Sequence, residues 1–311
     1  KEYKAMFERQ APKADQPKTM LPTDPKNIWM EGIGLIGLGA NAKAASIAGD
    51  LVVQNARVRA IGEDAGGFRP ISEKDLFDCE YWSLEQAKLG KGAPPKFQGK
   101  IVMITGGSGT IGFALAKAFS KLGAQTILVD KDEIALEESV AKLGVGHKYF
   151  PIDVTHSDAA NQAMLTAINN FGGLDILISN AGAAHAGPML GISNEELRNA
   201  FELNFFSHYS FSTEAAKILK DQNRGGQILF NISKQAVNPG KNFGAYGLPK
   251  ATTFFLMRQL ALELGSDGIR VNGINADRIR SGLLTDDFIS SRAKSRGVSE
   301  SEYMAGNLLN K

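Results

Sequence analysis

The sequence predicts an α/β protein in which a doubly wound parallel sheet follows a smaller N-terminal α+β segment. Six short apolar runs alternate with five longer stretches of helical periodicity between residues 95 and 311. The apolar runs lack clean alternation, which is typical of strands buried on both faces. The segment 90–95 combines Gly, Lys, Ala and Pro, as linkers do, and a different pattern precedes it.

The segment before that linker, residues 1–94, predicts a small α+β unit. It opens with polar sequence rich in Lys and Pro, and an apolar stretch follows from Ile28 to Leu38. The stretch from Ala40 to Ile61 then carries apolar side chains on one helical face. We place the domain boundary in the linker, so that residues 95–311 form the second domain.

In the second domain, strands and helices are expected in strict alternation. Parallel strands in this order bring their carboxyl ends to one edge of the sheet, where doubly wound folds bind ligands. The expected strands are Ile101–Thr105, Thr126–Asp130, Lys148–Asp153, Leu174–Ser179, Gln227–Ile232 and Arg270–Ile274. The expected helices span residues 111–122, 132–142, 157–171, 193–220 and 243–265.

Two glycine patterns are candidates for a phosphate-binding turn. The first runs from Gly32 to Gly37 and matches Gly-x-Gly-x-x-Gly, but only a short apolar run precedes it. The acid expected about 20 residues later, Asp50, lies inside a helical pattern, so we interpret this pattern as a structural turn. The second pattern, Thr-Gly-Gly-Ser-Gly-Thr-Ile-Gly at 105–112, follows a strand directly and precedes a helix.

The second pattern predicts a dinucleotide site, with a ligand-free tight turn as the alternative. Glycines let backbone N–H groups approach a pyrophosphate, and the helix N-terminus adds positive potential. Asp130 ends the next strand, where a carboxylate would bind the adenosine ribose and repel a 2′-phosphate, so NAD is expected rather than NADP. Lys131 beside it could pair with the 2′-phosphate and so reduce the preference for NAD over NADP. The turn residues expected to contact the cofactor are Gly106, Ser108, Gly109, Thr110, Ile111 and Gly112.

Tyr246 and Lys250 stand four residues apart, which places them one turn apart on a helix. A nearby ammonium is expected to lower the pKa of the phenol toward neutrality, and the phenol can then exchange protons. Pro249 fits only if this helix begins close to Tyr246. Ser233 follows an apolar strand, so its hydroxyl is expected at the same edge, holding a substrate oxygen. A pair on a surface helix is the alternative.

Together these residues resemble the short-chain dehydrogenase/reductase family, a family of Rossmann folds, over residues 97–311. The resemblance implies that Ser233, Tyr246 and Lys250 are the catalytic serine, tyrosine and lysine, and that Lys250 also binds the nicotinamide ribose. It implies that Asn204 completes the tetrad by holding a proton-relay water. Ala276 and Asp277 stand where the family has Pro-Gly. Further cofactor contacts are implied for Asp153, Val154, Asn180, Ala181, Gly182, Tyr246 and Ser281.

A second resemblance covers nearly the whole chain. Segments 34–39 and 76–89 look like the tail of a class II aldolase domain, and with 233–237 and 295–298 they resemble bifunctional rhamnulose-1-phosphate aldolase/short-chain dehydrogenases. This implies a lactaldehyde-like substrate. The charged start, Lys1 to Lys4, has neither an initiator Met nor a signal-peptide core, so the chain is expected to be a fragment or a processed product. Family members run on into one more helix and strand, and this chain is expected to lack that unit. The resemblance also leads us to expect a homo-oligomer formed through helices 193–220 and 243–265.

Composition narrows the partners. The chain has 311 residues, 43% of them hydrophobic, and a net charge of +2, which favours neither nucleic acid nor a membrane surface. No apolar run reaches the roughly 18 residues of a membrane span. The single cysteine, Cys79, fits a reducing, cytoplasmic location. No metal site is expected, because the four histidines (147, 156, 185 and 208) lack ligand-type spacing and are interpreted as surface or packing residues.

The sequence therefore predicts an NAD-dependent oxidoreductase with Tyr246 as its acid/base. Hydride would pass between nicotinamide and a small hydroxy-aldehyde, alcohol or sugar-derived substrate. The alternative is a dinucleotide-binding or scaffolding domain without turnover of its own. The loop 278–305 is the variable part of such folds, so the sequence leaves the substrate itself open.

Overall fold

The computed structural model describes residues 1–86, 93–184, 186–279 and 284–305. It divides into two compact units, residues 1–98 and 99–311. The expected linker at 90–95 lies partly outside the described residues, because the description stops at residue 86 and resumes at 93.

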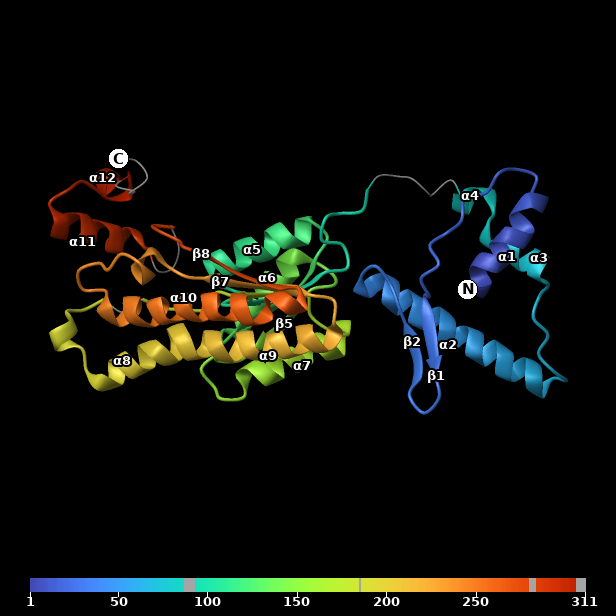
Figure 1. The fold of residues 1–311 in the computed structure, drawn as a ribbon, viewed down its shortest axis with the longest axis horizontal. Coiled ribbons are helices and arrows are strands. Elements are labelled where there is room, and N and C mark those ends of the chain that lie inside the picture. Colours follow the sequence, from blue (N-terminus) through green and yellow to red (C-terminus); the bar gives the residue numbers. More distant parts are fainter. Residues whose placement is uncertain (87–92, 185, 280–283, 306–311) are drawn as a thin grey trace. The chain divides into compact units, whose positions relative to one another are not determined.

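The first unit is a small α+β arrangement (Figure 1). Helices α1 (Glu2–Gln10) and α3 (Glu73–Glu80) enclose a core of Met6, Phe77 and Tyr81. A 3₁₀ turn (Ala11–Lys13) follows α1, and the short helix α4 (Ser83–Gln86) follows α3. An antiparallel hairpin of β1 (Asn27–Met30) and β2 (Gly34–Gly37) lies against the long helix α2 (Ala42–Asp64).

The first glycine pattern lies in this hairpin, which confirms its interpretation as a structural turn. Gly32 has a φ of +75° in the connection, and the later glycines belong to β2 itself. A Cβ added at Gly37 would lie 2.3 Å from the carbonyl oxygen of Ala45 on α2. The glycines therefore allow the close approach of strand and helix.

The second unit is built on a parallel sheet of six strands in the order β5-β4-β3-β6-β7-β8. All five residues of β3 are buried, in agreement with a sheet covered on both faces. The order reverses between β3 and β6, and doubly wound sheets bind ligands beside such a reversal. Each expected strand is confirmed within two residues: β3 (Ile101–Thr105), β4 (Gln125–Asp130), β5 (Lys148–Pro151), β6 (Ile176–Ser179), β7 (Gly226–Asn231) and β8 (Ile269–Ile274).

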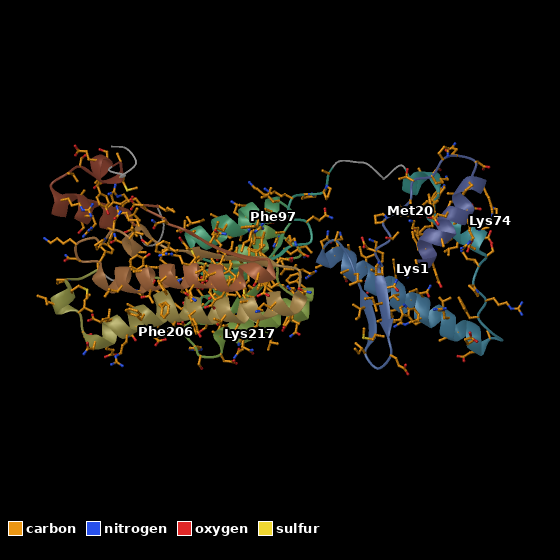
Figure 2. All side chains as sticks on the ribbon, viewed as in Figure 1. Lys1, Met20, Lys74, Phe97, Phe206 and Lys217 are labelled. Atoms are coloured by element: carbon orange, nitrogen blue, oxygen red, sulfur yellow. The ribbon has the colours of Figure 1, made fainter. Side chains whose placement is uncertain are left out.

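Helices cover both faces of this sheet (Figure 1). One face carries α5 (Thr110–Lys121) and α6 (Glu133–Leu143). The other carries α7 (Ala159–Phe171), α9 (Ser207–Gln222) and α10 (Gly244–Leu264). The side chains between the layers are drawn in Figure 2. After β8, helices α11 (Asp286–Arg296) and α12 (Glu300–Ala305) pack on each other around Ile289, Ala293 and Tyr303.

The stretch expected as one helix at 193–220 is interrupted. It consists of α8 (Asn194–Phe201), a π-helical turn (Glu202–Phe206) and then α9. A capping box of Ser193 and Glu196 starts α8. One wide turn hardly disturbs the apolar periodicity, so the pattern could not reveal it. Such turns occur frequently at functional sites, and this one contains Asn204.

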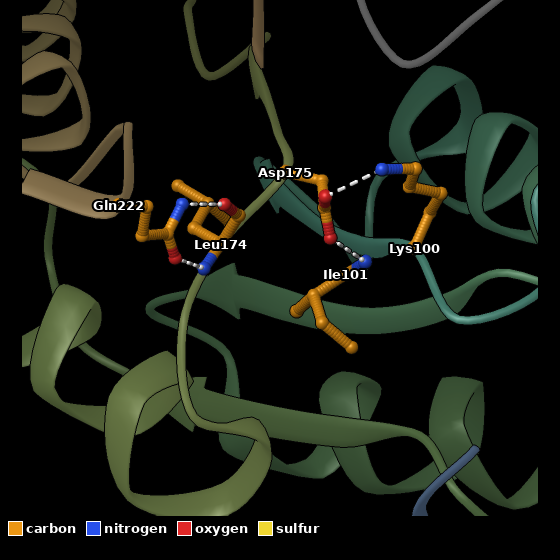
Figure 3. A network of polar contacts seen from close by, with 5 residues as sticks. All are labelled: Lys100, Ile101, Leu174, Asp175 and Gln222. Carbon is orange, nitrogen blue, oxygen red and sulfur yellow. Dashed lines mark hydrogen bonds and ion pairs between the residues drawn. The ribbon is translucent and has the colours of Figure 1, made fainter. Parts of the chain in front are cut away.

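A polar network fastens the end of α9 to the start of β6 (Figure 3). The Gln222 side chain donates to Leu174 O at 2.6 Å and accepts from Leu174 N at 2.9 Å. Beside it, Asp175 accepts from Ile101 N at 3.0 Å and pairs with Lys100 at 2.8 Å. Backbone groups at the strand entrances are thus satisfied by side chains.

Replacing Gln222 by Met should therefore lower the free energy of unfolding by about 1–3 kcal/mol, because both polar groups of buried Leu174 lose their partner. Gln259→Met is the matched control, since Gln259 is exposed and bonds only Glu263 within α10. Urea unfolding of both variants measures the difference. Equal losses would show that the network adds no stability.

Candidate active site

Two adjoining cavities open at the carboxyl edge of the parallel strands. The larger, of about 490 Å³, is lined by the glycine turn, the end of β4 and the segments after β5 and β6. The smaller, of about 140 Å³, is lined by the segments after β7 and β8 and by α10, α11 and α12. Ile111 and Asn231 line both cavities, so the two meet at these residues.

The glycine turn has the geometry that a phosphate-binding turn needs. Gly106 has a φ of +63°, in the region that favours glycine. A Cβ added at Gly112 would lie 2.0 Å from Gly106 O. Only glycine at position 112 therefore allows helix α5 to pack this closely against the turn. Helix α5 has Gly109 as its N-cap and no side-chain cap, which leaves its first N–H groups without a side-chain acceptor. Gly106, Gly109, Thr110, Ile111 and Gly112 all line the larger cavity.

Asp130 stands at the end of β4 with its carboxylate held in place. Ser108 donates to it through Oγ at 2.7 Å and through its backbone N–H at 3.3 Å. The Lys131 backbone N–H donates to the other carboxylate oxygen at 2.8 Å. Asp130 and Lys131 line the larger cavity, whereas Ser108 supports Asp130 and does not line it.

The segment after β6 is tied to β3 by hydrogen bonds. Thr105 Oγ1 accepts from the backbone N–H groups of Asn180 and Ala181 at 2.9 and 3.0 Å. Asn231 donates to Asn180 Oδ1 at 2.8 Å. A Cβ added at Gly182 would lie 2.8 Å from Asn204 Oδ1. The expected residues in this part of the larger cavity are Asp153, Val154, Asn180, Ala181 and Gly182, and the sequence analysis missed Ile152, Thr155, Ala183, Leu203 and Asn231.

Ser233 and Tyr246 come together in the smaller cavity. Ser233 follows β7, and Tyr246 lies in the first turn of α10. Burial raises the pKa of Tyr246, and a side-chain hydrogen bond with Ser233 opposes that rise. The expected lowering of this pKa by Lys250 is therefore wrong for the structure. Desolvation outweighs the amine, whose nitrogen lies 5.8 Å from the centre of the tyrosine ring.

Pro249 departs from the expectation that it lies in the first turn. Helix α10 begins at Gly244, so Pro249 lies inside the helix, beyond the first turn. Its ring nitrogen cannot donate to the carbonyl of Ala245, four residues earlier. Thr253 Oγ1 donates to Pro249 O at 3.0 Å and to Asn204 O at 2.8 Å. The helix continues past the proline and joins the π-helical turn through this threonine.

Lys250 is buried, with 2% of its surface exposed, and lines neither cavity. Its ammonium nitrogen donates to Asn231 O at 3.2 Å and contacts His208 Nε2 at 3.2 Å. Burial lowers the pKa of Lys250 to about 7. Burial, followed by the charge of Lys250, holds the pKa of His208 well below its usual range. A neutral imidazole that accepts from Lys250 at Nε2 carries its proton on Nδ1, which lies 2.6 Å from Ser179 Oγ.

His208 is buried, in agreement with its interpretation as a packing histidine, but the sequence analysis missed its contact with Lys250. It follows Asn204 by four residues, which on a helix places the two on the same face. That spacing was the available signal. His147 also fits the expectation, since it is half-buried and contacts Ser120 and Thr126 at 2.9–3.1 Å. His185 lies outside the described residues.

Asn204 is fully buried in the π-helical turn. Its amide nitrogen donates to Ala183 O at 3.0 Å and to Ala200 O at 3.1 Å. Its Oδ1 has no hydrogen-bond partner among the described residues. A buried acceptor without a partner is rare and costly. The amide is thus anchored on one side and leaves an acceptor toward Gly182, close to Lys250.

Other features bound the site. Ser281 lies outside the described residues. Within the described ranges, no group of three or more His, Cys, Asp or Glu side chains has the arrangement of a metal site. Nor does the described part of the chain contain a helix that combines the length and the apolar character of a membrane span.

Comparisons with known proteins bear on both units. The family profile described as short chain dehydrogenase matches residues 100–288, and the profile described as aldolase class II, second domain, matches residues 1–89. The Uncharacterized oxidoreductase YuxG of Bacillus subtilis (strain 168) is 32% identical over 306 residues, which cover 96% of this chain and 44% of YuxG. This chain therefore spans less than half of that relative's length.

Further matches cover the second unit. The 7alpha-hydroxysteroid dehydrogenase of Escherichia coli (strain K12) is 33% identical over 182 residues, 58% of this chain and 71% of that protein. The structure of 3-ketoacyl-(acyl-carrier-protein) reductase from Brucella melitensis complexed with NADH has a TM-score of 0.60 and 27% identity, covering 63% of this chain and 82% of that one. Because the dehydrogenase profile spans more than half of the residues, the chain belongs to the short chain dehydrogenase family, oxidoreductases that bind a nicotinamide cofactor.

Proposed function

We propose that this chain is an NAD-dependent oxidoreductase for a small hydroxy-aldehyde, alcohol or sugar-derived substrate. One observation carries the proposal. The Tyr246 phenol and the Ser233 hydroxyl line the smaller cavity, which adjoins the cavity of the glycine turn, and the Lys250 nitrogen lies 5.8 Å from the centre of the Tyr246 ring. When bound, the cofactor would accept or supply the hydride at C4 of its nicotinamide.

The larger cavity fits such a cofactor. Glycines line it at 106, 109, 112 and 182, and the N-terminus of α5 has no side-chain cap, so a pyrophosphate could lie close to backbone N–H groups there. Asp130 would accept from the adenosine ribose. Lys250 would bind the nicotinamide ribose, as the family resemblance implies. Ser281 is proposed at the nicotinamide end on the same ground.

The chain's own residues account for the proton. Ser233 and Tyr246 would both hold the substrate oxygen, and a phenol with a raised pKa stays protonated and ready to donate when a carbonyl is reduced. In alcohol oxidation the phenol would first release its own proton to water, and the phenolate would then accept the proton of the substrate hydroxyl. Asn204 Oδ1 would accept a hydrogen bond from a water that returns a proton to Tyr246. Such a water would satisfy this oxygen, which has no partner among the described residues.

The N-terminal unit supports a bifunctional parent protein. The aldolase match over residues 1–89 and the similarity to YuxG across both units fit the resemblance to rhamnulose-1-phosphate aldolase/short-chain dehydrogenases. A lactaldehyde-like substrate follows from that proposal. The chain has no histidine before position 147, so the aldolase metal would be held by another part of the parent. Cleavage of rhamnulose 1-phosphate by this chain alone would contradict the placement of the aldolase metal in another part of the parent.

We also propose that the second unit forms a homo-oligomer through α9 and α10. Large apolar side chains are exposed along them, among them Phe206 just before α9, Tyr209 in its first turn, and Phe255 and Leu262 on α10. Figure 2 labels Phe206, with Lys217 farther along α9. Exposed apolar surface of this extent is typical of interfaces. A monomeric mass in light scattering would contradict the proposal.

Tyr246→Phe should remove turnover and leave NADH binding nearly unchanged, because the phenol acts on substrate and the glycine turn holds the cofactor. The rate should fall about 10²–10⁴-fold, the usual contribution of such a group. Tyr149→Phe, which removes a hydroxyl that bonds Glu137 and lines neither cavity, is the control. Rates from a panel of alcohols and aldehydes, with cofactor fluorescence for binding, measure both effects. Binding without any turnover in the wild type would favour the scaffolding alternative.

Asp130→Ser should narrow the preference for NAD over NADP. In the wild type a 2′-phosphate would meet the held carboxylate, and NADP should bind about 1–3 kcal/mol more weakly. Without the carboxylate, Lys131 can pair with the phosphate. Asp221→Ser, which removes an exposed carboxylate at the end of α9, is the control. Titrations measure the affinities of both proteins for NAD and NADP. Equal affinities in the wild type would mean that Asp130 does not distinguish a free ribose hydroxyl from a 2′-phosphate.

Lys250→Met should change how stability depends on pH. Lys250 has an ordinary pKa of 10.5 in the unfolded chain and one of about 7 when folded. Between these values the unfolded chain binds the extra proton, so the free energy of unfolding of the wild type rises with pH. Relative to Lys250→Met, it should rise by about 2–4 kcal/mol from pH 7 to 9.5. Lys121→Met, at an exposed lysine, should show no such trend in urea unfolding. A flat difference for Lys250→Met would refute the burial of the charge.

A further inference from the structure

The smaller cavity is strongly cationic, which the proposed function does not use. Among the described residues that line it, Lys234, Arg278, Arg292 and Arg296 bring four positive charges, and Asp277 is the one carboxylate. Three of the cations come from segments that follow β8, so this charge belongs to the cavity next to Tyr246 and not to the cofactor cleft.

Asp277 does not neutralise this set. Its Oδ2 lies 3.1 Å from Lys234 Nζ, in a well-formed ion pair. Its other oxygen lies 4.0 Å from Arg278 Nε, beyond hydrogen-bond distance. The Arg278 side chain is only 12% exposed, and its Nη1 is buried without a hydrogen-bond partner among the described residues. Leaving a buried guanidinium N–H without an acceptor costs free energy, so an anion that accepts from Arg278 Nη1 would be stabilising there.

Aromatic rings hold the guanidinium groups in place. The guanidinium carbons of Arg278 and Arg296 lie 4.9 and 5.2 Å from the centre of the Tyr303 ring, so both cations contact one ring. The guanidinium carbon of Arg292 lies 4.8 Å from the ring centre of Phe243. The Phe243 ring in turn lies 6.5 Å from that of Tyr246. Like charges gathered in this way repel each other unless an anion lies between them.

We infer that this cavity binds an anionic oxygen group of the substrate, a carboxylate or a phosphate, with Arg278 as the principal ligand. Arginine forms paired hydrogen bonds with both groups. This inference rests on the proposed function for its chemistry. After the Tyr246 phenol has released its proton to solvent, the alcohol carbon would give its hydride to NAD and the hydroxyl proton would pass to the Tyr246 phenolate, so that the net products are a carbonyl, NADH and one proton. The anionic group remains unchanged and orients the reacting carbon.

Matched substrate pairs test the charge. Lactate is compared with its methyl ester, and glycerol 3-phosphate with glycerol, in NAD-dependent oxidation. At least one anion should have a KM about tenfold or more below that of its neutral partner, the size expected for one charge-assisted hydrogen bond. The two pairs distinguish a carboxylate from a phosphate. A preference for the neutral member in both pairs would overturn the inference.

Variants assign the effect to the cavity. Arg278→Met should raise KM for the preferred anion at least about tenfold and leave the neutral partner within about threefold. Arg296→Gln, at an exposed residue of α11 whose loss should not affect folding, should act in the same direction with a smaller factor. Arg198→Gln, an exposed arginine of α8, should change neither. Equal losses for the charged and neutral members would mean a general structural defect and would reject the inference.

Calorimetry separates this inference from the proposed function. Lactate and glycerol 3-phosphate are titrated into the wild type and into Arg278→Met and Arg296→Gln, with no turnover required. Binding that the variants weaken supports the anion site even if no substrate is oxidised, in which case only the dehydrogenase proposal fails. If neither anion binds the wild type, or if both variants bind as well as the wild type, the anion site is refuted whatever the turnover.

Discussion

The burial of one amine organises the site. The Lys250 nitrogen donates to Asn231 O on β7 and contacts His208 on α9. His208 in turn lies within hydrogen-bond distance of Ser179 at the end of β6. An ammonium removed from water is costly without such partners. Three neighbouring elements of the parallel sheet and its helices must therefore keep their register for Lys250 to stay where it is. The position of Tyr246, one turn earlier on the same helix, depends on that register.

Much of this arrangement could be predicted from the sequence, because it follows from local patterns. Strands buried on both faces, such as β3, leave continuous apolar runs, and a glycine turn between a strand and a helix is typical of dinucleotide binding. What failed depends on surroundings that spacing does not encode. The Tyr-x-x-x-Lys spacing indicated the neighbours of the phenol but not its desolvation, which sets the direction of its pKa. His208 looked ordinary because its partner, Lys250, stands 42 residues later.

The π-helical turn shows the same limit at the level of the backbone. A single wide turn hardly changes the apolar periodicity of residues 193–220, yet it sets where Asn204 points. Its amide nitrogen is fixed by Ala183 O and Ala200 O, while Thr253 donates to its backbone carbonyl. Contacts from different segments thus leave one acceptor unpaired, and no pattern in one segment could have indicated this. The arginine cavity is likewise assembled from segments far apart in sequence.

The two cavities differ in the kind of positive charge that they present to a ligand. The larger cavity offers backbone N–H groups and a helix N-terminus, which would attract the phosphates of the proposed cofactor without adding a full charge close to Lys250. The smaller cavity uses full guanidinium charges, and these lie against Tyr303 and Phe243. Positive potential there stabilises a substrate anion and a phenolate alike. Burial raises the pKa of Tyr246 and the hydrogen bond with Ser233 opposes that rise, whereas a substrate anion beside the arginines would lower the positive potential around the phenol. With the proposed anion site, substrate charge and proton donation would be coupled through the same few arginines.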